Sequence, residues 1–127
     1  NSTLTAPTNN PKAKLSNAAW NAGFLGSVAN TSTVYFEGSY GDVLYFGSGT
    51  AAATPAAVLK PEEAWNLDTK LDDGQPHIGS ITTLESQGLN AGTQCSSITP
   101  AATTLAASVY SLSNAGAACS LVFKTGY

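Results

Sequence analysis

The stretch LDTKLDDGQPHIGSI, residues 67–81, holds the densest group of charges in this chain. The charged side chains stand between residues 68 and 73 and are Asp68, Lys70, Asp72 and Asp73. His77, the only histidine of the chain, follows them. Three interpretations compete for this stretch: a catalytic site, a metal-binding loop, and a structural corner between a helix and a strand.

Catalysis has the right residue types but the wrong context. His77, Asp72, Asp73 and Ser80 are the side chains of a hydrolytic triad. A triad needs a nucleophile held on a rigid elbow, and the chain has no G-x-S-x-G pattern. Because a proline precedes it, His77 is expected to be an exposed residue of a turn or strand start. We therefore expect no enzyme activity.

A metal site is the second alternative. Asp68, Asp72 and Asp73 supply three carboxylates within six residues, whereas calcium takes six to eight oxygen ligands. The EF-hand order is not met, and zinc would need more His or Cys than the chain has. Calcium at these aspartates stays open, and no other cofactor is expected.

The structural interpretation is a helix exit. Pro61 suits the first position of a helix, and Ala64, Leu67 and Leu71 would form its apolar stripe. Asp72, Asp73 and Gly74 then end the helix, with a positive φ at Gly74. Asp68 could accept hydrogen bonds from the next turn, Lys70 could pair with an acid, and Pro76 prevents the helix from restarting.

Over the whole chain, the patterns predict two short helices, of which the one from Pro61 is the second, and four or five mostly antiparallel strands. Residues 1–14 are expected to form an extended N-terminal segment. A helix is expected over residues 16–26, with Trp20 and Phe24 on one face as core contacts. Strands are expected at 33–37 and 42–46 around a turn at 38–41, and at 77–85. A final hairpin is expected over 105–113 and 118–124 around Asn114–Gly116.

Length and composition bound the function. The 127 residues fit a single domain, 1–127. Charged residues are 10% of the chain, the net charge is −3, and there is no arginine, so nothing resembles a nucleic-acid footprint or a polybasic membrane patch. The sequence begins at Asn1 without a leader or a long apolar run, which we interpret as a mature or truncated form. The two cysteines, Cys95 and Cys119, are either one disulfide or two buried thiols, and an exported chain favours the disulfide.

Several motifs in order resemble one protein family. AWNLDTKLDDGQPHIGSI (64–81), then Cys95, Tyr110 and CSLVF (119–123), is similar to the globular head of bacterial type IV pilin-like proteins, the pilins and pseudopilins. AAWNAGFLGS (18–27) is similar to a short segment of the same branch. The positions that match the motif around the corner are Asp68, Lys70, Asp72, Asp73, Gly74, Pro76 and Gly79.

The resemblance implies a fold, a location and partners. The fold would be an α+β pilin-like head, with short helices packed on an antiparallel sheet of about four strands and a C-terminal region tied by Cys95–Cys119. The chain would be a structural subunit of a type IV pilus or of a type II secretion pseudopilus, at the cell surface or in the periplasm. A minor pilin or adhesin-type binding module at a filament tip is the alternative.

One element of the family is missing from residues 1–127. Its members carry a long apolar N-terminal helix that enters the membrane and packs the filament core. Here that helix would have been removed or would lie on a separate short chain, and the partners would be other pilin-like subunits. We therefore expect that this chain does not assemble alone, and that Trp20 and Phe24 are the candidate apolar contacts with such a helix.

Overall fold

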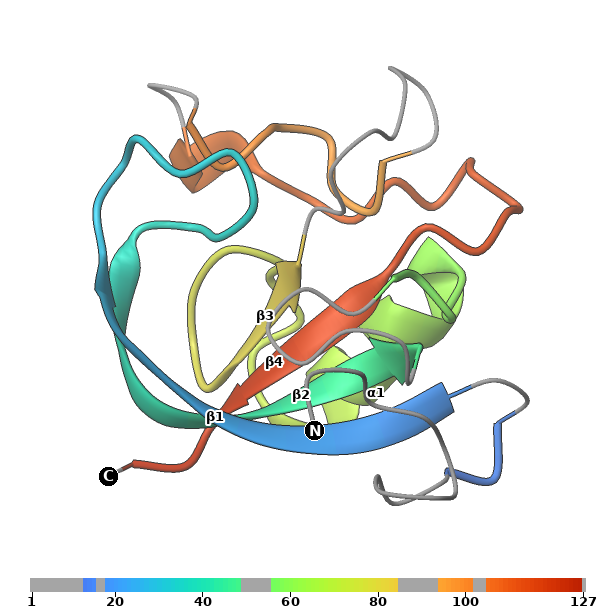
Figure 1. Ribbon diagram of the computed structural model, residues 1–127. Helices are drawn as coiled ribbons and strands as arrows, with labels where there is room; N and C mark the ends of the chain where they lie inside the picture. The colour runs from blue at the N-terminus through green and yellow to red at the C-terminus, as the bar shows by residue number, and fades with distance from the viewer. Residues whose placement is uncertain (1–12, 16–17, 49–55, 85–93, 102–104, 127) are drawn as a thin grey trace.

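A single antiparallel sheet organises the chain (Figure 1). The computed structural model describes residues 13–15, 18–48, 56–84, 94–101 and 105–126. The strands are β1 (Ala18–Val28), β2 (Gly38–Ser48), β3 (Ile81–Leu84) and β4 (Ser120–Lys124), in the order β1-β2-β4-β3. One helix, α1 (Pro61–Leu71), and a 3-10 turn, η1 (Leu105–Ala107), complete the described elements. The expected α+β class with four antiparallel strands is confirmed.

The helix expected over residues 16–26 is wrong, because residues 18–28 form β1. The strand pairs with β2 from Ala18 opposite Ser48 to Val28 opposite Gly38. Alanines favoured a helix locally, but a long ladder of backbone hydrogen bonds outweighs intrinsic propensity. Residues 16 and 17 lie outside the described part.

The expected turn at residues 38–41 is also wrong, since β2 runs through it. Gly41 has φ 65° and stands opposite Gly26, φ 68°, where the register of β1 and β2 shifts. The positive φ of these glycines therefore accommodates a register shift between two paired strands and not a hairpin turn. Residues 33–37 form no regular strand and touch the sheet through a bridge between Tyr35 and Leu84.

The C-terminal hairpin expected over residues 105–113 and 118–124 is wrong as well. Tyr110 forms an isolated β-bridge with Ser96, and β4 pairs with β2 on one side and β3 on the other. β3 is shorter than the strand expected over 77–85: residues 77–80 belong to the corner before it, and residue 85 lies outside the described part. The expected extended segment 1–14 lies outside it too, except for residues 13 and 14.

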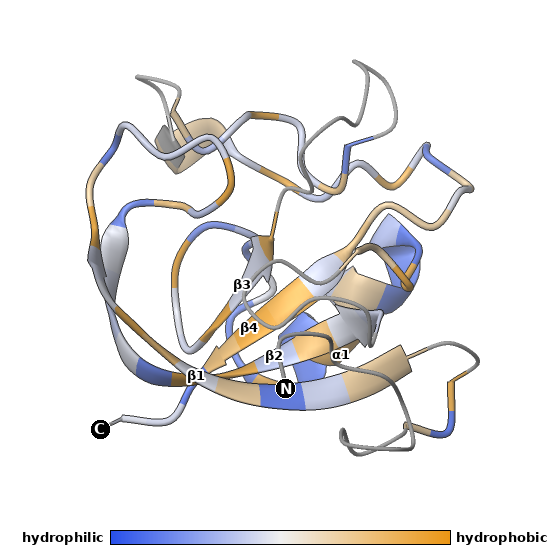
Figure 2. Cartoon of the chain, in the orientation of Figure 1, coloured by the Kyte–Doolittle hydropathy of each residue, from blue (hydrophilic) through white to orange (hydrophobic). Residues whose placement is uncertain are grey.

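Two apolar clusters lie on the two faces of the sheet. Because cross-strand partners share a face, Trp20, Phe46 and Leu121 mark one of them, which we call the helix-side face. On it Ala64 of α1 joins Phe46 and Leu121 in one cluster. The other face packs Tyr45 and Val122 against residues of the 33–40 segment. Figure 2 shows β4, which is central, as apolar along most of its length.

The helix α1 begins as expected and buries a different stripe. Pro61 is at its start, Glu62 and Glu63 are in its first turn, and Lys70 is in its last, which suits the helix dipole. Its buried residues are Pro61, Ala64 and Asp68. Leu67 and Leu71 are 37% and 66% exposed. The buried stripe expected from Ala64, Leu67 and Leu71 is therefore correct only at Ala64. No helix of the described residues is long and apolar enough to cross a membrane.

Candidate functional site

The corner between α1 and β3 is held by aspartate side chains. Asp68 is fully buried, and its carboxylate accepts the hydroxyl of Tyr110 at 2.6 Å and the backbone N–H of Gly74 at 3.2 Å. The Asp72 carboxylate accepts the N–H groups of Ser80 and Ile81. The end of the helix is thereby bonded to the C-terminal region through Tyr110 and to the first residue of β3.

The turn itself depends on two glycines. Gly74 has φ 73°, as expected, and Gly79 has φ 82°. A Cβ at Gly74 would come 2.7 Å from Thr69 Oγ1, and one at Gly79 would collide with the Asp72 carboxylate. Larger residues at either position are therefore disfavoured by backbone conformation and by space. Buried Pro76 contributes its carbonyl, which accepts the N–H and the hydroxyl of Thr83.

Burial changes the proton affinities in this corner. Burial raises the pKa of Asp68 to about 6, although the bonds from Tyr110 and Gly74 act in the opposite direction. Burial, and then the nearby Asp68 carboxylate, raises the pKa of Tyr110. The hydroxyl thus stays protonated and can donate to Asp68 across the neutral range.

The same carboxylates are the candidate calcium ligands. One oxygen each of Asp68, Asp72 and Asp73 can be chosen so that all lie within 4.8 Å of one another. Asp73 accepts the N–H of Gln75, so that four of the six carboxylate oxygens already accept N–H or O–H donors. A cation would compete with those donors, which makes the cluster better suited to holding the chain than to holding calcium.

His77 differs from the expectation of an exposed residue, because it is only 7% exposed. Its ring meets Phe36 edge-on, with centroids 6.0 Å apart, and burial lowers its pKa. Its Nδ1 has no hydrogen-bond partner among the described residues. A triad base would use that atom to hold a carboxylate, whereas Asp73, the carboxylate whose charge acts on His77, accepts the backbone N–H of Gln75.

Lys70 lies apart from the hydrogen bonds of the corner. It lines a groove of about 490 Å³ beside α1, together with Leu15, Phe46, Leu59, Glu63, Asn66 and Leu67. We call this the helix-side groove. No ion pair of Lys70 occurs within the described residues.

The disulfide is confirmed. Cys95 and Cys119 are bonded and fully buried, with Cα atoms 4.9 Å apart. The backbone of Cys119 forms an isolated β-bridge with Leu59, which lies just before α1, and Cys119 immediately precedes β4. The bond therefore ties the 94–98 segment to the point where the helix and the central strand meet.

An exposed apolar strip continues from the helix-side groove. Trp20 contacts Phe46 and Phe123, with ring centroids at 4.8 and 5.2 Å. Farther along the same face Phe24 is 77% exposed and Leu44 39%. We define the apolar strip by Trp20, Ala22, Phe24, Leu44 and Phe123. The core-packing pair expected of Trp20 and Phe24 is therefore correct only for Trp20.

Sequence reasoning found the corner but not its link to Tyr110, which was noted only as a motif position. It also missed Lys124 and Tyr40, which contact each other at a separate hollow on the sheet. The one available signal was a lone charge at the end of the apolar run SLVFK, residues 120–124.

Comparison with known proteins gives no match: no protein-family model, no curated protein and no solved structure matches this chain.

Proposed function

We propose that this chain is the head of a structural subunit of an extracellular or periplasmic filament, of the type IV pilus or type II secretion pseudopilus class. The observation that carries the proposal is the apolar strip on the helix-side face. Exposed Phe24 and partly exposed Leu44 lie on the same face as Trp20 and Phe123, and apolar side chains gathered on one exposed face often mark an interaction site. The motif resemblance around the corner, AWNLDTKLDDGQPHIGSI, supports the same class.

The occupant of the strip would be an apolar helix. The strip adjoins the helix-side groove at Phe46, which lines the groove and contacts Trp20 of the strip. Together they offer a surface next to α1 on which a second helix could lie along the sheet. Burying a phenylalanine such as Phe24 contributes about 2 kcal/mol, so a few such contacts would hold a helix already tethered nearby.

The disulfide and the low charge fit a chain that works outside the cytoplasm. Disulfides persist in oxidising compartments, and Cys95–Cys119 is fully buried. A surface with few charges and no arginine gives nucleic acid little to bind. On this proposal the chain is not an enzyme, and its partners are other subunits of the filament.

The test is incorporation of a strip variant into filaments. In cells that produce the full gene product, Phe24→Asp should abolish recovery of the protein in sheared filaments, because a charge would be buried against the helix. Val109→Asp is the matched control, since Val109 is 60% exposed and lies outside the strip. The purified heads of both variants should melt near the wild-type temperature.

Two results would contradict the proposal. One is normal incorporation of Phe24→Asp into filaments. The other is assembly of filaments from residues 1–127 alone, since the proposal assigns the filament core to another helix. Light scattering should instead show residues 1–127 as a monomer or a weak dimer.

A further inference from the structure

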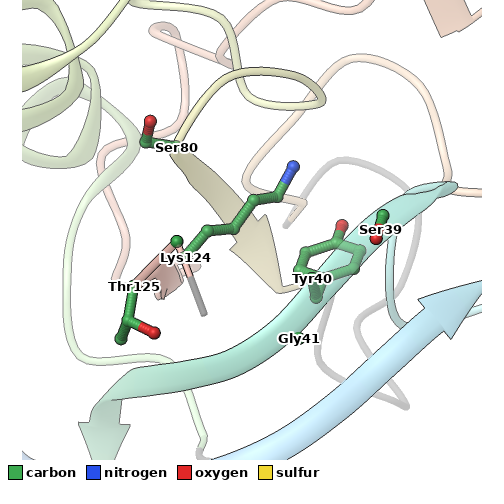
Figure 3. Close-up of a pocket in the computed structure, with 7 residues that line it drawn as sticks. Ser39, Tyr40, Gly41, Ser80, Lys124 and Thr125 are labelled. Carbon is green, nitrogen blue, oxygen red and sulfur yellow. The ribbon is translucent and has the colours of Figure 1, made fainter.

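An open hollow of about 570 Å³ lies where the start of β2, the residue before β3 and the end of β4 meet (Figure 3). Its lining includes Ser39, Tyr40, Gly41, Ser80, Lys124 and Thr125. These residues come from three separate parts of the sequence, and the sheet brings them together. The hollow is distinct from the helix-side groove, with which it shares no lining residue.

Lys124 provides the charge of this hollow. Its Nζ lies over the ring of Tyr40, 4.6 Å from the centroid. No ion pair of Lys124 occurs within the described residues. A cation held on an aromatic face keeps N–H donors for another acceptor, because the ring faces only one side of the ammonium group. Burial also lowers the pKa of Lys124, and a bound anion would offset that cost.

Two serines, Ser39 and Ser80, line the hollow together with Lys124. In Figure 3 Ser80 stands on one side of Lys124, and Ser39 on the other beside Tyr40. Both serines are exposed, and in the described part of the chain their hydroxyls have no hydrogen-bond partner. The other hydroxyls of the hollow are engaged: Tyr40 donates to the carbonyl of Phe36, and Thr125 to that of Asp42. Ser39 and Ser80 are thus the groups that can bind ligand hydroxyls.

The surrounding charge restricts the ligand. Asp72 and Asp73 are close enough to raise the pKa of Lys124 in opposition to burial. They would repel a doubly charged anion more than a singly charged one. We propose that the hollow binds a carboxylate carried on a small hydroxylated molecule, of which a uronic acid is the simplest example. The carboxylate binds Lys124, and the ligand hydroxyls bind Ser39 and Ser80.

The test is an NMR titration of the oxidised protein with four probes: glucuronate, glucose, acetate and inorganic phosphate. Glucuronate should give saturable shifts of the amides of Ser39, Gly41, Ser80 and Thr125, and a shift at the Lys124 side chain. Glucose and acetate each offer half of the chemistry, and phosphate offers a greater charge. Glucose and acetate should bind at least about tenfold more weakly, as expected for the loss of a charge-assisted bond or of several neutral ones. Phosphate should also bind more weakly than glucuronate, because Asp72 and Asp73 repel its second charge.

Variants separate the two halves of the site. Lys124→Gln should weaken glucuronate binding about tenfold or more, whereas Lys70→Gln, the same charge change at an exposed site on α1, should change it less than about twofold. Ser80→Ala keeps the backbone bond to Asp72 and should weaken glucuronate without affecting acetate. If Lys124→Gln does not fold, Ser80→Ala still decides between the outcomes.

Three outcomes would overturn the proposal. Equal binding of glucose and glucuronate would remove the role of the carboxylate. Equal binding of acetate or phosphate and glucuronate would remove the hydroxylated ligand class. Shifts confined to residues outside the hollow, or unchanged in Lys124→Gln, would place the binding elsewhere on the protein.

Discussion

The buried carboxylate of Asp68 should make the folded chain less stable as the pH rises. Its pKa is raised from 3.8 to about 6 in the folded state, because it is buried. Between these values the folded chain holds more protons than the unfolded chain, so its free energy of unfolding falls with increasing pH. A shift of about two units corresponds to roughly 3 kcal/mol, lost between about pH 3.5 and about pH 7.

Asp68→Asn isolates this contribution. The amide carries no charge, its oxygen can accept the Gly74 N–H, and its NH₂ can donate to the oxygen of Tyr110. Urea denaturation of both proteins at several pH values gives the difference in their free energies of unfolding. That difference should shift in favour of the variant by about 3 kcal/mol from acid to neutral pH.

The pH dependence of the wild type alone would not isolate Asp68, because His77 also titrates differently in the folded and unfolded chains. Burial lowers its pKa, so the unfolded chain binds more protons at this residue and stability rises with pH through its titration range. This trend opposes that of Asp68 in the wild-type profile. It cancels in the difference, because His77 is present in both proteins.

Tyr110→Phe gives an independent check on the sign. The Tyr110 hydroxyl bond lowers the pKa of Asp68, so its removal should raise that pKa and extend the loss of stability to higher pH. Glu62→Gln measures the effect of removing an exposed carboxylate from the same helix. A difference between wild type and Asp68→Asn that stays flat within about 0.5 kcal/mol across this range would refute the reasoning.

Three further predictions concern the corner and the disulfide. Cys119→Ser should lower the free energy of unfolding by about 3 kcal/mol in urea denaturation, in line with a loop of this size, and two free thiols by mass spectrometry of the native wild type would contradict it. Gly79→Ala should lower the melting temperature well beyond Gly126→Ala, because both positions have positive φ but only Gly79 would collide with Asp72; equal losses would remove the collision from the explanation. Calcium should leave the melting temperature unchanged, whereas a rise that disappears in Asp72→Ala would establish a metal site.

The corner was predictable because its signals are local. Pro61 fixes the start of α1, and the Asp-Asp-Gly sequence with a following proline marks its end. Positive φ at Gly74 followed from residue type alone. The disulfide could be predicted because the chain is short and has two cysteines without metal-type spacing.

Elements that depend on distant partners were not predictable. A helix was predicted over residues 16–26 because Ala18, Ala19, Ala22 and Leu25 favour one, and only pairing with β2 makes residues 18–28 a strand. His77 is buried because Phe36, far away in the sequence, packs against it. The hydrogen bond between Asp68 and Tyr110 and the contact between Lys124 and Tyr40 likewise join residues that no local pattern connects.

The place of β4 in the sheet has a consequence for how the protein is made. β4 is the last of the described strands and pairs with both β2 and β3, so the sheet cannot close until residues 120–124 have emerged from the ribosome. Such long-range pairing is slow compared with helix formation. A nascent chain therefore cannot complete its sheet before this segment is made, and the pairing of Cys119 with Cys95 waits for the same point, because Cys119 directly precedes β4.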